Sequence, residues 1–232
     1  MKTMTFTLES ATPLLMHRDN IEWADEMKKW QKDPANKGKS VAGDDRTPGF
    51  TWLGYLYHDG ENVSWPADNL LPALCKSAAN VKYKGQTTLK TIVPSNLHIV
   101  GDNLKFEAWN INKKGYEQIS IAPIFELQEE RDFREHLTLA KKLGSYDLYV
   151  VRVGVNGSKH VRVRPKFRMW RISGEMQVTD PELFTPEVIQ TIFDGLKTIG
   201  FGDWRPTSPS KPGRYGIPKP SKIKGGNIVP DA

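Results

Sequence analysis

Alternating apolar and polar residues predict the first strand of the chain. Residues 3–9 place Met, Phe and Leu on one side and threonines and a carboxylate on the other, which is the period-two pattern of a half-buried strand. Helical spacing then appears over residues 21–30. The polar Lys/Gly/Asp/Pro run of residues 32–48 has no apolar period, and we expect it to form a long mobile insertion.

Three later segments have the pattern of amphipathic helices. One is predicted to begin at Asp68 as N-cap and to run to residue 78. Another covers residues 185–199, begins with Thr, Pro and Glu in the order that favours a helix start, and stops at Gly200. Residues 128–143 are rich in Glu, Arg, Leu and Lys and precede a glycine that can close the last turn.

Hairpins and short strands are predicted between these helices. Asp59-Gly60 supplies a tight turn within residues 55–65, and residues 91–124 contain three short strand-like segments. Two alternating arms surround Asn156-Gly157, which is the strongest hairpin signal in the chain, and strand character continues to about residue 178. The mixture of strands and helices predicts an α+β fold.

Composition indicates the cellular compartment in which the protein is expected. Of the 232 residues, 38% are apolar, and Cys75 is the single cysteine. One thiol excludes an intramolecular disulfide framework and also Cys-based zinc or iron–sulfur sites, which need several thiolates. The sequence has no apolar run of about 18 residues and no apolar segment behind the first Lys, so neither a membrane span nor a signal peptide is predicted. We expect a cytoplasmic protein.

Basic residues are placed unevenly along the chain. Residues 152–171 hold seven Lys or Arg and no Asp or Glu, and residues 204–232 hold six against the lone Asp231. Thirteen of the 33 basic residues therefore lie in about a fifth of the chain. Such a concentration is typical of a surface that binds anions, nucleic acid among them.

Four of these cations alternate with apolar residues in the segment 161–170. In a strand, Arg162, Arg164, Lys166 and Arg168 would project from one face about 6–7 Å apart, close to the phosphate spacing of an extended single strand. An edge strand protected by charge is the alternative, although no acid interrupts the row. Because a strand fixes its cations and a Pro-rich loop does not, we expect this row to dominate affinity.

A glycine-rich basic loop follows the last predicted helix. Residues 200–216 read GFGDWRPTSPSKPGRYG, and glycines let backbone N–H groups approach an anion closely. The alternative is a helix end followed by an irregular exit. The loop is not a dinucleotide-binding fingerprint, in which the helix follows the glycines. Charge and stacking faces in this loop come from Arg205, Lys211, Arg214, Trp204 and Tyr215.

No catalytic or metal-binding motif is visible in the sequence. The five histidines lie too far apart for a short metal motif, and no Ser, Cys or acid forms a recognised nucleophile pattern with them. His17, directly after the first strand, is in the most suggestive place, although a structural role is the simpler interpretation. We therefore expect no cofactor and no metal.

The order of these parts resembles that of the RAMP superfamily. The resemblance rests on the end of the first strand (TPLLMH, residues 12–17), on a Pro-introduced helix (VSWPADNLLPALCKSA, residues 63–78) and on the glycine-rich loop. The stretch HVRVRPKFRMW (residues 160–170) through that loop also looks like phage and prophage proteins of the same group, akin to the guide-RNA-binding backbone subunits of CRISPR effector complexes. Together these parts cover roughly half the chain.

The resemblance implies a ferredoxin-like, RRM-like β-α-β-β-α-β core, RNA held through its backbone, and side-by-side assembly along the strand. We expect residues 1–203 to form this domain and residues 204–232 to form a basic Pro/Gly-rich arm outside the core, since five prolines fall in residues 205–226. The last core strand would have to come from residues 215–223, whose prolines are poor members of a ladder. Whether that strand forms is left open by the sequence.

The leading hypothesis is a non-catalytic protein that binds single-stranded nucleic acid, RNA rather than DNA, with little sequence specificity and possible oligomers or ribonucleoprotein subunits as partners. One alternative is an endoribonuclease of the same superfamily using His17, Asp19 or Asp25. Another is a structural subunit without a nucleic-acid role. The residues predicted to contact nucleic acid are Arg162, Arg164, Lys166, Arg168, Arg171, Trp204, Arg205, Lys211, Arg214 and Tyr215.

Overall fold

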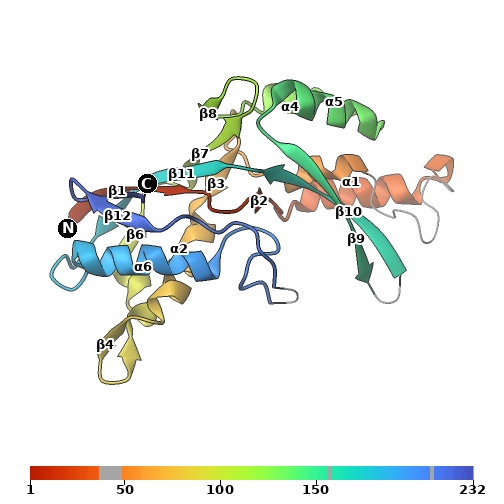
Figure 1. Ribbon diagram of the computed structural model, residues 1–232. Helices are drawn as coiled ribbons and strands as arrows, with labels where there is room; N and C mark the ends of the chain where they lie inside the picture. Colours follow the sequence, from red (N-terminus) through yellow and green to blue (C-terminus); the bar gives the residue numbers. More distant parts are fainter. Residues whose placement is uncertain (37–48, 156–157, 210–211, 232) are drawn as a thin grey trace.

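A large mixed sheet with helices on one face forms the main body of the protein in the computed structural model (Figure 1). The structure describes residues 1–36, 49–155, 158–209 and 212–231. The expected insertion therefore lies mostly outside the described residues, as does the predicted turn Asn156-Gly157. The strand order of the large sheet is β12 (Ser221–Lys224), β13 (Asn227–Pro230), β1 (Lys2–Glu9), β11 (Trp170–Val178), β7 (Asn103–Asn110) and β3 (Ser64–Pro66), with β6 (Leu97–Ile99) on β11 and β8 (Gly115–Glu117) on β7.

Period-two alternation decides which face of this sheet is buried. Met4, Phe6 and Leu8 of β1 are at most 2% exposed, whereas the threonines between them are exposed or half-buried. Gly174 lies opposite Phe6 in β11, and a Cβ there would approach Phe6 to 2.9 Å, so glycine lets the two strands pack. The predicted first strand is confirmed.

Two helices cover the buried face. They are α2 (Ala67–Ala78) and α6 (Pro186–Ile199), which pack against each other. Thr185 caps α6 by accepting a hydrogen bond from the Val188 N–H, as the sequence predicts. Asp68 is not the N-cap of α2: the cap is Pro66, and Asp68 lies in the first turn, where its charge favours the helix dipole.

A second sheet lies beside one end of the large one (Figure 1). Its order is β2 (Leu14–Leu15), β10 (Ser158–Phe167) and β9 (Asp147–Val155). The predicted continuous strand to residue 178 is interrupted after β10, and the chain passes there into β11 of the large sheet. The 3₁₀ helix Gly49–Tyr55 packs against β10 and contacts α1 (Ile21–Lys32) and α5 (Phe133–Leu143).

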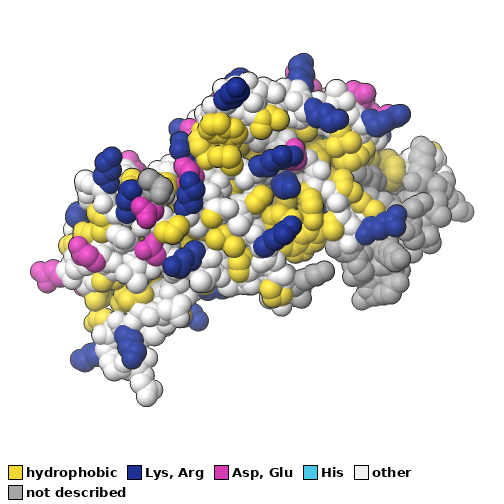
Figure 2. Space-filling view, in the orientation of Figure 1, with side chains coloured by type: hydrophobic (Ala, Val, Ile, Leu, Met, Phe, Trp, Pro, Cys, Tyr) yellow, Lys and Arg dark blue, Asp and Glu magenta, His cyan; other side chains and the backbone are white. Residues whose placement is uncertain are grey.

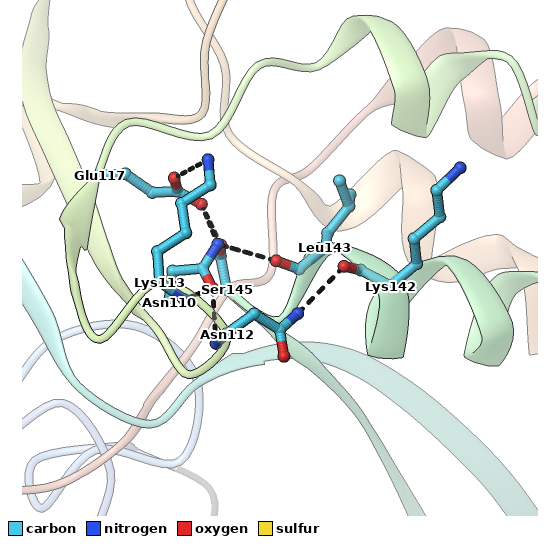
Figure 3. Close-up of polar contacts among 7 residues, drawn as sticks. All are labelled: Asn110, Asn112, Lys113, Glu117, Lys142, Leu143 and Ser145. Atoms are coloured by element: carbon cyan, nitrogen blue, oxygen red, sulfur yellow. Dashed lines mark hydrogen bonds and ion pairs between the residues drawn. The ribbon is translucent and has the colours of Figure 1, made fainter.

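Asparagine side chains tie the turn between β7 and β8 to the end of α5 (Figure 3). Asn110 Nδ2 donates to the carbonyl of Leu143 at 2.9 Å, and Asn112 Nδ2 donates to that of Lys142 at 3.1 Å. These carbonyls have no partner within the helix. The network therefore stabilises the predicted helix end, where Gly144 adopts φ 74°.

Short elements connect the rest. The predicted hairpin of residues 55–65 is reduced to a tight turn with a single bridge between His58 and Val63. The region 91–124 contains strands and also helical turns, since proline at residues 94 and 123 favours a helix start. The remaining elements are the 3₁₀ helices Pro34–Asn36 and Leu89–Thr91, β4 (Lys82–Lys84), β5 (Thr87–Thr88), α3 (Val93–Asn96) and α4 (Ala122–Phe125).

The C-terminal segment is part of the fold, so the expectation of an arm outside the core is wrong. Ile228 of β13 is fully buried and pairs in parallel with Phe6 of β1. Pro218 and Pro220 precede β12 and do not interrupt it, so the ladder needs no N–H from either. In the described part of the chain, no helix is both long and apolar enough to cross a bilayer.

Candidate nucleic-acid interface

Glycines hold the loop of residues 200–216 against the segment that precedes His17. Gly202 has φ 69°, and a Cβ there would lie 2.3 Å from the carbonyl oxygen of Leu15, so only glycine fits. The next residue, Asp203, donates its N–H to that carbonyl at 3.0 Å, and the Gly216 N–H donates to Pro13 at 2.7 Å. Backbone hydrogen bonds therefore fix the described part of the loop, whereas the sequence analysis treated a Pro-rich loop as not fixed.

Asp203 of this loop covers the charged face of β10. Its Oδ2 accepts a hydrogen bond from Arg164 Nε at 2.9 Å, and the Arg164 guanidinium stacks on the Tyr55 ring at 4.2 Å. Arg164 is only 5% exposed. The prediction that Arg164 projects into solvent is wrong, because a segment 39 residues further along the chain packs on that face.

The other predicted cations fall into two groups. Arg162 and Lys166 share the face of Arg164 on β10, and Lys166 Nζ lies 5.4 Å from the centroid of the Tyr149 ring. Arg168 lies beyond the end of β10 and pairs with Asp147. Arg171 lies on the open face of the large sheet, where its guanidinium is 3.8 Å from the Tyr116 ring and pairs with Glu9. The row of four cations is thus shorter than the sequence predicts.

Three aromatic rings join the loop to the β9–β10 hairpin. Tyr149 lies opposite Arg164 in the register, with ring centroids 6.0 Å from Trp204 and 5.7 Å from Tyr215. Trp204 is half-buried and has φ 49°, an uncommon conformation for a residue with a side chain. Tyr215 is 8% exposed, so packing occupies the ring predicted to stack on a base. Sequence reasoning missed Tyr149; the available signal was the predicted turn at Asn156-Gly157, because counting outward from it places Tyr149 opposite Arg164.

The remaining loop cations lie at different depths. Arg205 is half-buried and donates from Nη1 to the carbonyl of Gly202 at 2.9 Å. Arg214 is exposed. Lys211 lies outside the described residues. Figure 2 shows Lys and Arg side chains among apolar ones over the middle of the visible face.

A pocket of about 210 Å³ opens between the loop and α2. His17, Asp203 and Arg205 line it together with residues that the sequence did not single out, chiefly Asn69 and Lys76 of α2. His17 Nδ1 lies 3.6 Å from Asp203 Oδ2. Burial lowers the pKa of His17, nearby Arg164 lowers it further, and Asp203 opposes both. The imidazole is thus held towards its neutral form.

His17 also lines a second pocket, of about 290 Å³, on the side of α1 and β10. This pocket includes Arg18, Asp19 and Arg162. Asp25 is exposed on α1 and lines neither pocket. Of the three residues considered for cleavage, the structure brings together His17 and Asp19.

Among the described residues, no group of three or more His, Cys, Asp and Glu side chains could hold a metal ion. No protein-family model matches the chain, and no curated protein matches its sequence.

Proposed function

We propose that this chain binds single-stranded nucleic acid, RNA rather than DNA, at the composite surface formed by the loop 200–216 and the β9–β10 hairpin. One observation carries the proposal: the Asp203–Arg164 pair and the contact of Tyr149 with Trp204 place the basic loop and the basic strand side by side. Cations from both segments then follow one strand of phosphates, and the half-buried Trp204 offers a ring to a base. The contacts are to the backbone, so little sequence specificity is expected.

We also propose that the large sheet and its helices form a RAMP-like, ferredoxin-like core, and the order of elements supports this. β1, α2, β7, β11 and α6 follow one another as β-α-β-β-α, with β11 between β1 and β7. The hairpin of β12 and β13 takes the place of a last strand beside β1, with β13 parallel to it. RNA is chosen over DNA on the family resemblance, which also suggests assembly along the strand.

Fluorescence anisotropy with a labelled single-stranded RNA tests the proposal. Four cations, Arg162, Lys166, Arg205 and Arg214, are free of carboxylate partners within the described residues. About four phosphate contacts to a single strand give a slope of log K against log salt near −3. Absence of binding to any single-stranded RNA or DNA at low salt would contradict the proposal.

Paired variants then locate the surface. Because backbone hydrogen bonds order the loop, the expected dominance of the strand loses its basis. Arg162→Ala with Lys166→Ala, and Arg205→Ala with Arg214→Ala, should each flatten the salt slope by about 1.4. A matched control, Lys82→Ala with Lys84→Ala, removes two exposed cations from the distant β4 (Figure 1) and should leave the slope unchanged.

Cleavage of RNA is a second candidate function, and the position of His17 between two pockets favours it. A strand that crosses from one pocket to the other passes the imidazole, and a neutral imidazole can accept a proton from a 2′-hydroxyl. Labelled RNA incubated with stoichiometric protein, with and without magnesium, tests this function. Intact RNA argues against cleavage, whereas products that disappear with His17→Ala support it.

Sizing by light scattering separates RNA binding from a purely structural role. Particles that grow with the length of added RNA support binding and assembly along the strand. Discrete oligomers that ignore RNA favour a structural subunit.

A further inference from the structure

The pocket of about 290 Å³ beside His17 contains a cluster of uncompensated positive charge. Arg18 follows β2, Lys28 lies on α1 and Arg162 lies on β10, so three separate segments each bring one cation to it. Asp19 is the only carboxylate among its described lining residues. The cavity therefore has a positive potential that an incoming anion would neutralise.

These three cations differ from their neighbours in lacking an acidic partner. Arg164, Arg168 and Arg171 each pair with a carboxylate within 4 Å. Across the described residues, no carboxylate lies within that distance of Arg18, Lys28 or Arg162. All three basic residues that line this pocket are thus available to an external anion.

Arg18 is also held in place. Its Nη1 lies 3.0 Å from His58 Nε2, and a neutral imidazole accepts the hydrogen bond there. Burial and the neighbouring Arg18 both lower the pKa of His58, which keeps this acceptor neutral. An oriented guanidinium loses less freedom when it binds an oxyanion than a mobile one does.

Aromatic side chains form fixed walls of the pocket. Trp23 fills the space beside Gly54, where a Cβ would lie 2.0 Å from its ring, and its Nε1 donates to the carbonyl of Thr51 at 3.2 Å. The Tyr55 ring lies between the guanidinium of Arg164 and the ring of His17, which is nearly perpendicular to it. The pocket thus combines rigid rings with cations, as nucleotide sites do.

We infer that this pocket binds a phosphate monoester at the end of a nucleic-acid strand. A monoester carries nearly two negative charges at neutral pH, whereas an internal phosphodiester carries one. Three cations with one acid therefore match a terminal phosphate better than a phosphate within the chain. The inference rests on the proposed function, because the strand would reach this pocket past His17 from the loop 200–216.

Single-stranded RNAs of one sequence, ending in a 5′-phosphate, a 3′-phosphate or only hydroxyls, test the inference in the full-length protein. One phosphorylated end should lower Kd about fivefold to tenfold relative to hydroxyl ends, because charged hydrogen bonds are gained. The end that gives this preference identifies the source of the phosphate. Equal Kd values for all three strands would overturn the inference while leaving RNA binding intact.

A matched pair of variants assigns the preference to the pocket. Lys28→Gln should abolish it, whereas Lys29→Gln, an exposed neighbour on α1 that does not line the pocket, should keep it. A preference that survives both Lys28→Gln and Arg162→Gln places the phosphate elsewhere and contradicts the inference.

Inorganic phosphate tests the pocket even if no RNA binds. At matched ionic strength, phosphate should raise the Tm of the wild type and of Lys29→Gln more than that of Lys28→Gln. If phosphate raises Tm in this pattern but no RNA binds, the proposed function is contradicted and the anion pocket is supported. If phosphate raises Tm equally in all three proteins, the anion pocket is contradicted.

Discussion

Asp203→Ala should destabilise the protein far more than an ordinary surface substitution. The change leaves the guanidinium of Arg164 without its carboxylate, in a position where the Arg164 side chain is 6% exposed and that of Asp203 is 18% exposed. It also removes the Oδ1 that accepts the Trp204 N–H at 3.0 Å. Both losses weaken the contact between the loop and β10.

The size of the effect follows from burial. Removing one partner of a buried ion pair costs about 3–5 kcal/mol, because the remaining charge is left in a poorly solvated site. Partial exposure of Asp203 lowers the expected cost to about 2–4 kcal/mol. In a chain of this length, about 3 kcal/mol corresponds to a fall in Tm of roughly 9 °C.

Urea denaturation of Asp203→Ala beside Asp147→Ala measures this difference. Asp147 pairs with Arg168, whose side chain is 69% exposed, so losing that pair should cost about 0–1 kcal/mol. Adding Arg164→Met to Asp203→Ala should recover part of the loss, since the unpaired charge is then gone. A cost for Asp203→Ala within about 1 kcal/mol of the control would refute the argument.

Two further predictions concern packing and pH. The Trp52 Nε1–H donates to Nδ1 of the buried His136, and burial lowers the pKa of this histidine below its unfolded value of about 6.5. The contribution of His136 to stability should therefore be constant above that pH and fall below it. Urea midpoints measured between about pH 8 and pH 5 test this dependence. Gly213→Ala would place a Cβ 1.9 Å from the carbonyl oxygen of Trp204, so it should displace the loop and weaken RNA binding in anisotropy, while Gly115→Ala, with nothing closer than 4.0 Å, should do neither.

The parts of the fold that local pattern determines were predictable. Alternation in residues 3–9 and the Thr-Pro-Glu start of α6 depend on neighbours in sequence, and both are confirmed. The parallel pairing of Ile228 with Phe6 joins the two ends of the chain, and no periodicity reports such a partner. The prolines before β12 led to the prediction that residues 204–232 form an arm outside the core. They lie outside β12, so they do not prevent the strand from forming.

The candidate site was predictable as composition but not as arrangement. The concentration of basic residues identified both the loop and the strand as candidate binding segments. Alternation alone, however, predicted that Arg164 is exposed to solvent. Its burial depends on Asp203, whose position is set by Gly202 against Leu15. Long-range packing therefore decides the position of Arg164, and local alternation does not report it.

Ultraviolet cross-linking of bound single-stranded RNA, followed by mass spectrometry of the cross-linked peptides, tests the central claim most directly. Two pairs of half-buried aromatic residues lie on separate surfaces of the described chain: Tyr149 and Trp204 at the loop and hairpin, and Trp109 and Tyr116 on the open face of the large sheet. We predict cross-links in peptides that contain Trp204 or Tyr149. Cross-links confined to peptides with Trp109 or Tyr116 would contradict the assignment of the binding surface.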